Sequence, residues 1–275
     1  MVSSEAAPYA KSGGLGDVIG SLPKALQAAG VDVRVVIPKY ATIKQEHLKD
    51  VEYIGSFFVN LGWRTQEAKI LIKKEPFPIY FIENDFYFGR EGLYGYGDDN
   101  ERFAFFSRAV LHMLSVVNFY PDVIQCNDWQ TGPVCMLLKE TYKKMVFYSN
   151  IKTLYTIHNL QYQGNFGKET MELLQVPSWC FENGNAEFYG NVSYMKMGLV
   201  YADHISTVSK TYAQEIQTPQ YGYGMDGVLR SRSQDLSGIL NGIDFLANDP
   251  ATDKRIIKNF DVNSIELKKE NKKAL

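Results

Sequence analysis

Short apolar runs rich in β-branched residues alternate along this chain with segments of helical periodicity, and this alternation strongly limits the possible folds. Strands that alternate with helices build βαβ units, whose strands run parallel. The sequence therefore predicts an α/β fold with a doubly wound, mostly parallel, Rossmann-like sheet. The predicted strands are 33–37, 122–126, 153–157, 205–209 and a buried strand at 238–240, and the predicted helices are 18–29, 102–117, 134–142, 192–201 and 212–216.

The stretch 51–84 departs from this alternation. Three strand-like segments follow one another there with only short breaks, at 54–61, 69–72 and 79–82. Strand-like runs joined by short connections are typical of antiparallel hairpins. We therefore expect a β-rich insertion that includes hairpins, and we expect loops at the glycine-containing segments 88–100 and 219–227.

The length of the chain bears on its domain organisation. Its 275 residues correspond to one large or two modest domains, and such a chain buries roughly three quarters of the surface that it exposes when unfolded. The tail 249–275 is charged, rich in lysine and poor in apolar residues. We therefore predict a Rossmann-like domain over residues 1–248, followed over 249–275 by a linker and a surface helix that lead to a further C-terminal domain.

The balance of charges argues against one class of partner. The chain has 29 Lys and Arg against 31 Asp and Glu, a formal net charge of −2. Nonspecific nucleic-acid binding needs an excess of basic residues, so we expect no nucleic-acid partner. The start lacks the pattern of a signal peptide and no apolar run reaches about 18 residues, so we expect no membrane partner and a cytoplasmic location.

The three cysteines, Cys126, Cys135 and Cys180, show no CxxC spacing. Neither a disulfide framework nor a four-ligand zinc site can be drawn from them. This pattern fits a reducing compartment, in agreement with a cytoplasmic location.

A glycine-rich segment, Lys11–Asp17 (KSGGLGD), lies between a strand-like start and the predicted helix 18–29. Adjacent glycines let the backbone approach an anion closely, and a helix N-terminus directs free N–H groups toward it. Lys11 adds a positive charge for a phosphate. The spacing is neither that of a Walker loop nor GxGxxG, so a plain glycine-rich turn capped by Asp17 is an equally good interpretation.

Two polar clusters follow predicted strands: Asn127, Asp128, Trp129 and Gln130 after 122–126, and His158 and Asn159 after 153–157. In open α/β sheets ligands bind outside the carboxyl ends of the strands, so both clusters should open onto the same edge as the glycine-rich segment. Asp128 has an alternative role as a helix cap, and a single histidine is more often structural than catalytic. His47, His112 and His204 show no such placement, and we interpret them as structural.

Six motifs spread along nearly the whole chain resemble those of bacterial glycogen synthases and plant starch synthases. They are KSGGLGDV at Lys11, NDWQTG at Asn127, TIHNLQYQG at Thr156, YADHISTVS at Tyr201, YGMDGVL at Tyr223 and ILNGID at Ile239. The resemblance implies the N-terminal half of a two-Rossmann-domain (GT-B type) retaining glucosyltransferase. It further implies transfer of glucose from ADP-glucose to the non-reducing 4-hydroxyl of an α-1,4-glucan, without a metal ion or cofactor, in the cytoplasm or, for a plant member, the plastid.

The resemblance also assigns site residues. Lys11, Gly13 and Gly14 match the family loop that meets the donor diphosphate, and His158 matches the histidine beside the donor glucose. Further cleft positions of the family are matched by Asp17, Tyr94, Asp128 and Asn241. The expected roles are catalytic for His158 and Asp128, donor-binding for Asp17 and Asn241, and sugar- or acceptor-side for Tyr94.

The chain departs from the family pattern in three places. Met1 is followed directly by Val2, where the family has more of a first strand, so we expect a truncated or displaced start. The second half of the family's fold would follow Leu275, so we expect this chain alone to be inactive. Asn127 and Gln130 stand where family members often have histidines.

The motifs leave two alternatives. Another nucleotide-sugar glycosyltransferase, with a different donor, would need a different loop from KSGGLGDV. A glucan-binding or assembly module without activity of its own is the non-enzymatic alternative, because aromatic residues make up 13% of the chain and exposed rings stack on sugars.

Overall fold

Two compact units make up the chain in a computed structural model, which describes residues 1–245 and 248–275. The first unit is Met1–Leu240 and the second is Asn241–Leu275. The first unit ends at Leu240, whereas the predicted domain ends at residue 248. The predicted division into a domain over 1–248 and a linker with a surface helix over 249–275 stays a prediction. Each unit is described by itself.

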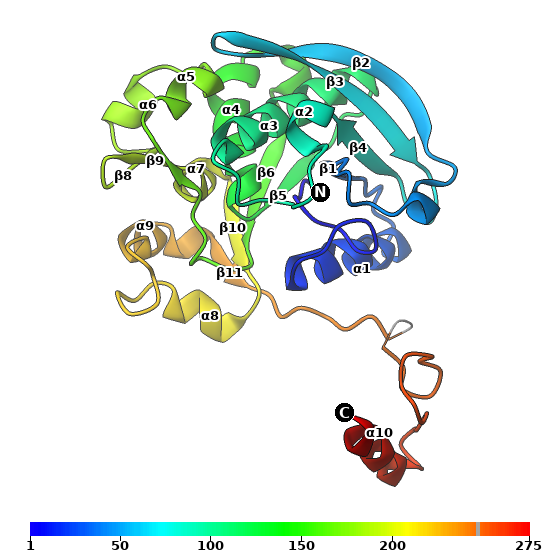
Figure 1. The fold of residues 1–275 in the computed structure, drawn as a ribbon. Helices are drawn as coiled ribbons and strands as arrows, with labels where there is room; N and C mark the ends of the chain where they lie inside the picture. The colour runs from blue at the N-terminus through cyan, green and yellow to red at the C-terminus, as the bar shows by residue number, and fades with distance from the viewer. Residues whose placement is uncertain (246–247) are drawn as a thin grey trace. The chain divides into compact units, whose positions relative to one another are not determined.

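Strands and helices alternate through most of the first unit (Figure 1). The strands are β1 (Val35–Pro38), β2 (Glu52–Leu61), β3 (Arg64–Lys73), β4 (Ile79–Glu83), β5 (Val123–Asn127), β6 (Lys152–Ile157), β7 (Asn165–Phe166), β8 (Glu187–Phe188), β9 (Asn191–Ser193), β10 (His204–Thr207) and β11 (Leu236–Gly238). The α-helices are α1 (Gly14–Ala28), α2 (Asp85–Phe88), α3 (Asp99–Val116), α4 (Gly132–Leu137), α5 (Thr170–Leu174), α6 (Trp179–Glu182), α7 (Tyr194–Tyr201), α8 (Lys210–Glu215), α9 (Asp226–Ser231) and, in the second unit, α10 (Lys268–Ala274).

The main sheet consists of two four-stranded parts, ordered β1-β4-β3-β2 and β11-β10-β6-β5. The pairs β1–β4, β5–β6, β6–β10 and β10–β11 are parallel. Val2 joins the two parts, because it forms parallel bridges with both Val36 and Cys126. Its N–H donates to the Gln125 carbonyl at 2.7 Å, and the Ser3 N–H donates to the Val36 carbonyl at 3.1 Å. The predicted mostly parallel α/β sheet is confirmed.

The predicted β-rich insertion is also confirmed. Strands β2 and β3 form a long antiparallel hairpin, at the upper right in Figure 1, and β3 pairs antiparallel with β4. Gly62 sits in the turn of the hairpin with a positive φ of 59°, a backbone conformation that glycine adopts without strain. Because β4 pairs parallel with β1, the insertion returns the chain to the parallel sheet.

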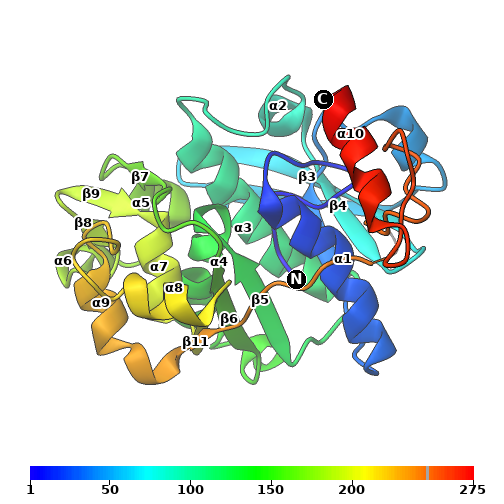
Figure 2. The same ribbon diagram turned by 90° about the horizontal axis from the view of Figure 1, so that it is seen from below.

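Helix α3 forms the centre of the packing beside this sheet. Its residues Phe103, Phe105 and Phe106 are fully buried, and the helix contacts β2 and α4. Helix α4 contacts α7 in turn, and α8 contacts β10 and β11 (Figure 2). The predicted helix 134–142 is divided here, because α4 ends at Leu137 and a π-helix continues over Leu138–Tyr142.

Several predicted element boundaries were wrong; for example, the helix predicted over 18–29 begins at Gly14 and the strand predicted over 69–72 begins at Arg64. Three further boundaries also differ. The buried strand at 238–240 is β11, which begins and ends two positions earlier and is half-buried because it lies at the edge of the sheet. The helix predicted from residue 192 begins at Tyr194, because Val192 pairs in β9 and Ser193 accepts a capping hydrogen bond from the Lys196 N–H. The loop predicted over 219–227 ends at α9, whose first residue is Asp226.

The second unit has little regular structure besides α10, which has no buried residue. A pair of hydrogen bonds links this helix to the preceding segment: Lys258 N–H donates to Asn271 at 2.9 Å, and the Asn271 amide donates back to the Lys258 carbonyl at 2.8 Å. None of the helices described in either unit is both long and apolar enough to cross a membrane.

The close approach of α4 and α7 gives a test of the packing. A Cβ added at Gly132 would lie 1.8 Å from the Tyr194 carbonyl oxygen, so α7 would have to move. We expect Gly132→Ala to lower the free energy of unfolding by about 3 kcal/mol, the upper range for overpacking. Gly227→Ala is the control, because a Cβ there meets only the Arg230 side chain, at 4.0 Å. Urea unfolding of both variants measures the difference, and equal stabilities would contradict the packing.

Candidate active site

The glycine-rich segment forms the N-terminus of α1. Gly13 is the N-cap residue, and the helix begins at Gly14. A Cβ at either glycine would meet no atom of the described residues within 4 Å, so the backbone here faces open space. Because the first turn of an α-helix leaves its N–H groups without partners inside the helix, this end can accept an anion.

Lys11 and Asp17 flank this helix end and form an ion pair with 2.7 Å between Nζ and Oδ1. Both side chains are about half exposed. Pairs of this kind contribute at most about 1 kcal/mol, so a phosphate can compete with Asp17 for the lysine.

A buried carboxylate fixes the shape of the same loop. Glu5 accepts hydrogen bonds from the Ser12 N–H at 2.5 Å, from the Ser12 hydroxyl at 2.6 Å and from the Gly13 N–H at 3.3 Å. It is only 3% exposed. Sequence reasoning missed Glu5, because nothing in the sequence distinguishes a carboxylate that folds back onto a loop from one at the surface.

Tyr94 reaches the glycine-rich loop from a distant part of the chain. Its hydroxyl lies 3.1 Å from the Ser12 hydroxyl, which is itself bonded to Glu5. Ser12 lies between Lys11 and Gly13, so this contact brings three predicted site residues together: Lys11, Gly13 and Tyr94.

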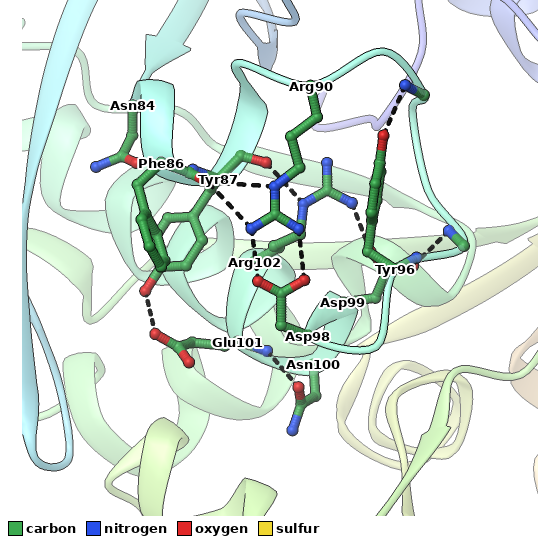
Figure 3. Close-up of polar contacts among 12 residues, drawn as sticks. Asn84, Phe86, Tyr87, Arg90, Tyr96, Asp98, Asp99, Asn100, Glu101 and Arg102 are labelled. Atoms are coloured by element: carbon green, nitrogen blue, oxygen red, sulfur yellow. Dashed lines mark hydrogen bonds and ion pairs between the residues drawn. The ribbon is translucent and has the colours of Figure 1, made fainter.

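Two arginines, Arg90 and Arg102, hold the connection between α2 and α3 (Figure 3). Tyr94 belongs to this connection. Arg90 forms two hydrogen bonds of 2.6 Å with Asp98. Arg102 is fully buried and donates to Asp99 at 2.5 Å and to the Leu93 carbonyl at 3.1 Å. Bidentate and charge-assisted contacts of this kind restrict the loop to one conformation.

Asp128 connects the loops that follow β5 and β6. Its Oδ1 accepts hydrogen bonds from the backbone N–H groups of His158, at 2.7 Å, and Asn159, at 3.3 Å. The side chain makes no capping hydrogen bond to the short helix that follows it. The pKa of Asp128 is raised to about 7, chiefly by burial; the two backbone hydrogen bonds oppose this change, and the nearby negative charge of Glu5 adds to it.

His158 lies directly after β6, half-buried beside Asp128. Its Nε2 is 3.0 Å from Oδ1 of Asn127, the last residue of β5. Burial lowers the pKa of His158 to about 4, so the imidazole is neutral near pH 7. A neutral ring at a sheet edge can hydrogen-bond a sugar hydroxyl, and it stays uncharged while doing so.

The loops around Tyr94 and Asp128 share one aromatic contact. Phe103 packs against Tyr94, with 6.3 Å between ring centroids, and against Trp129 at 5.1 Å. Phe103 therefore links the connection that carries Tyr94 to the loop after β5. The charge of Glu5, which binds the glycine-rich loop, acts in addition on Asp128. Asn241 is exposed and begins the second unit, so its place in the site stays a prediction.

A cavity of about 580 Å³ lies elsewhere in the first unit. It is lined by residues at the amino ends of β1 and β5, among them Arg34 and Asp122. None of the predicted site residues lines it; these candidates lie instead on loops at the carboxyl ends of the strands, where ligands of open α/β sheets bind.

A domain with this sheet and these edge loops is of the GT-B glycosyltransferase type. The catalytic domain of starch synthase IV from Arabidopsis thaliana, solved with ADP and acarbose bound, superimposes with a TM-score of 0.91 at 33% identity, over 99% of this chain and 57% of that one. The family model described as "Starch synthase catalytic domain" matches residues 1–231. The chain belongs to this family.

Curated relatives agree with this assignment. The glycogen synthase of Clostridioides difficile (strain 630) is 52% identical over all of this chain and 58% of its own length. That of Moorella thermoacetica is 50% identical over all of this chain and 56% of its own length. The chain therefore spans somewhat more than half the length of the relatives that it matches, and the family resemblance stated from the motifs is confirmed.

The raised pKa of Asp128 predicts a pH dependence of stability. Between pH 3.8, the ordinary pKa of an aspartate, and about 7, Asp128 keeps a proton in the native state that it releases in the unfolded state, so the contribution of Asp128 to stability falls as the pH rises. From pH 5 to pH 8 this loss amounts to about 2–3 kcal/mol, at about 1.4 kcal/mol for each pH unit. Asp128→Asn, which cannot ionise, should remove that loss. His158, whose pKa is lowered to about 4, contributes in the opposite direction between about pH 4 and 6.5 in the wild type and in the variants alike.

Urea unfolding at pH 5 and pH 8 measures this difference. The exposed Asp122→Asn is the control and should keep the wild-type pH dependence. An Asp128→Asn variant whose stability changes with pH just as the wild type does would show that Asp128 is ionised in the folded protein at pH 5.

Proposed function

We propose that this chain forms the N-terminal, acceptor-side half of an ADP-glucose-dependent glycogen or starch synthase. The reaction is the retaining transfer of glucose to the non-reducing 4-hydroxyl of an α-1,4-glucan. The observation that carries the proposal is the arrangement at the carboxyl edge of the sheet, where an open helix N-terminus, a lysine and a neutral histidine belong to connected loops.

The departing nucleotide defines the task of the glycine-rich loop. As the bond between glucose and diphosphate breaks, negative charge develops on the β-phosphate, and donors placed in advance stabilise it. Lys11 and the free N–H groups at the start of α1 are suited to this task. Glu5 supports them, because it holds Ser12 and Gly13 in place before any ligand binds.

The sugar defines the task of the loops after β5 and β6. The glucosyl carbon gains oxocarbenium character in the transition state, so its hydroxyl groups must be held without adding a positive charge. His158 is neutral near pH 7 and can act as a hydrogen-bonding group there. Asp128 fixes the backbone beside it, and Tyr94 lies at the border with the glycine-rich loop.

The remaining parts of the proposal concern substrates and location. ADP is bound in the Arabidopsis structure together with acarbose, which supports a nucleotide-sugar donor and a glucan acceptor for this chain. The free cysteines Cys126, Cys135 and Cys180 suit a reducing compartment, and we place the protein in the cytoplasm.

Replacement of Lys11 by Ala tests the donor site. The experiment uses a fusion of this chain to the C-terminal part of the Clostridioides difficile relative, with radiolabelled ADP-glucose and glycogen. Loss of one charge-assisted contact to phosphate costs on the order of 2 kcal/mol, so kcat/KM for ADP-glucose should fall about 30-fold. The KM for glycogen should stay within about twofold of the wild-type value, because Lys11 contacts the phosphate of the donor and not the acceptor.

Lys24→Ala is the matched control, because Lys24 is an exposed lysine on the same helix, away from its N-terminus. It should leave both parameters unchanged. Normal use of ADP-glucose by the Lys11 variant would remove this lysine from the donor site, and a fusion that transfers no glucose at all would count against the proposed activity.

A further inference from the structure

The buried side-chain amide of Asn127 contacts the ring of His158. Asn127 is fully buried at the end of β5. Its Oδ1 lies 3.0 Å from Nε2 of His158, and its Nδ2 donates a hydrogen bond of 2.9 Å to the Val2 carbonyl. One side chain thus connects the histidine ring to the segment that joins the two parts of the sheet.

The Val2 carbonyl determines which way this amide points. A carbonyl oxygen accepts hydrogen bonds but cannot donate them, so the Asn127 atom that faces Val2 must be the nitrogen. The amide oxygen of Asn127 then faces His158, and this oxygen can also only accept. Nε2 of His158 must therefore carry the proton.

The other ring nitrogen follows from the charge of the ring. Burial keeps His158 neutral near pH 7, so the imidazole holds a single proton. With that proton on Nε2, Nδ1 carries a lone pair. Within residues 1–245 and 248–275, no group hydrogen-bonds to this Nδ1.

We propose that Asn127 is a positioning residue that selects the His158 tautomer, so that Nδ1 is presented as an acceptor to a hydroxyl group of the bound sugar. The use of Nδ1 by a sugar rests on the proposed function, whereas the tautomer is a property of the folded chain alone. The two parts can therefore fail separately.

Nuclear magnetic resonance of the chain with ¹⁵N-labelled histidine rings tests the tautomer at pH 7 without ligand. A protonated and a bare ring nitrogen have well-separated shifts, and His158→Gln identifies the signals. We expect Nε2 of His158 to be protonated and Nδ1 to be bare. In Asn127→Ala both shifts should move toward each other, because the ring then exchanges between tautomers.

Two controls accompany this measurement. His204 contacts the Ser237 hydroxyl at 3.1 Å, and since a hydroxyl can donate or accept, its tautomer is not fixed and should be averaged already in the wild type. Asn60→Ala, an asparagine on β2, should leave the His158 signals unchanged.

A wild-type His158 with its proton on Nδ1 would overturn the proposal even if Asn127→Ala does not fold. Unchanged His158 shifts in a folded Asn127→Ala variant would overturn it as well. Addition of ADP-glucose to the wild-type chain should shift Nδ1 far more than Nε2. If the tautomer is as expected and Nδ1 does not respond, the tautomer stands and the contact with the sugar is refuted.

Discussion

The backbone of Val2 and Ser3 is the connection on which the rest of the structure depends. These two residues bond to β5 on one side and to β1 on the other, and so join the two parts of the sheet. The chain leaves this position directly into Glu5 and the glycine-rich loop. The same Val2 carbonyl also binds Asn127, which lies beside His158. The glycine-rich loop and the loop that bears His158 are therefore attached to one segment of extended backbone.

Two buried acids, Glu5 and Asp128, organise the candidate site. Both carboxylates accept hydrogen bonds from backbone N–H groups of loops, and these bonds hold the loops in place. Because both are removed from water and lie near each other, the pKa of Asp128 is raised to about 7. His158 is neutral in the same surroundings. The cationic Lys11 lies in contrast at the exposed rim, where an arriving phosphate can reach it.

The sequence predicted the sheet and the sheet edge that carries the candidate residues, because strand and helix periods are local and parallel strands share one carboxyl edge. It could not predict the contacts that organise that edge. Glu5 and Asn127 act through partners such as Ser12 and Val2 whose position depends on the tertiary fold. The end of the sheet was misplaced for a related reason: β11 has only one neighbouring strand, so its apolar pattern is weak.

We propose that the loops bearing Gly14, Tyr94 and His158 form one binding site. Titration of the ¹⁵N-labelled chain with ADP-glucose, followed through the backbone amide signals, tests it most directly. We expect the amides of all three loops to shift together and to fit a single dissociation constant. Shifts confined to one of these loops, or centred on the cavity at the amino ends of β1 and β5, would contradict it.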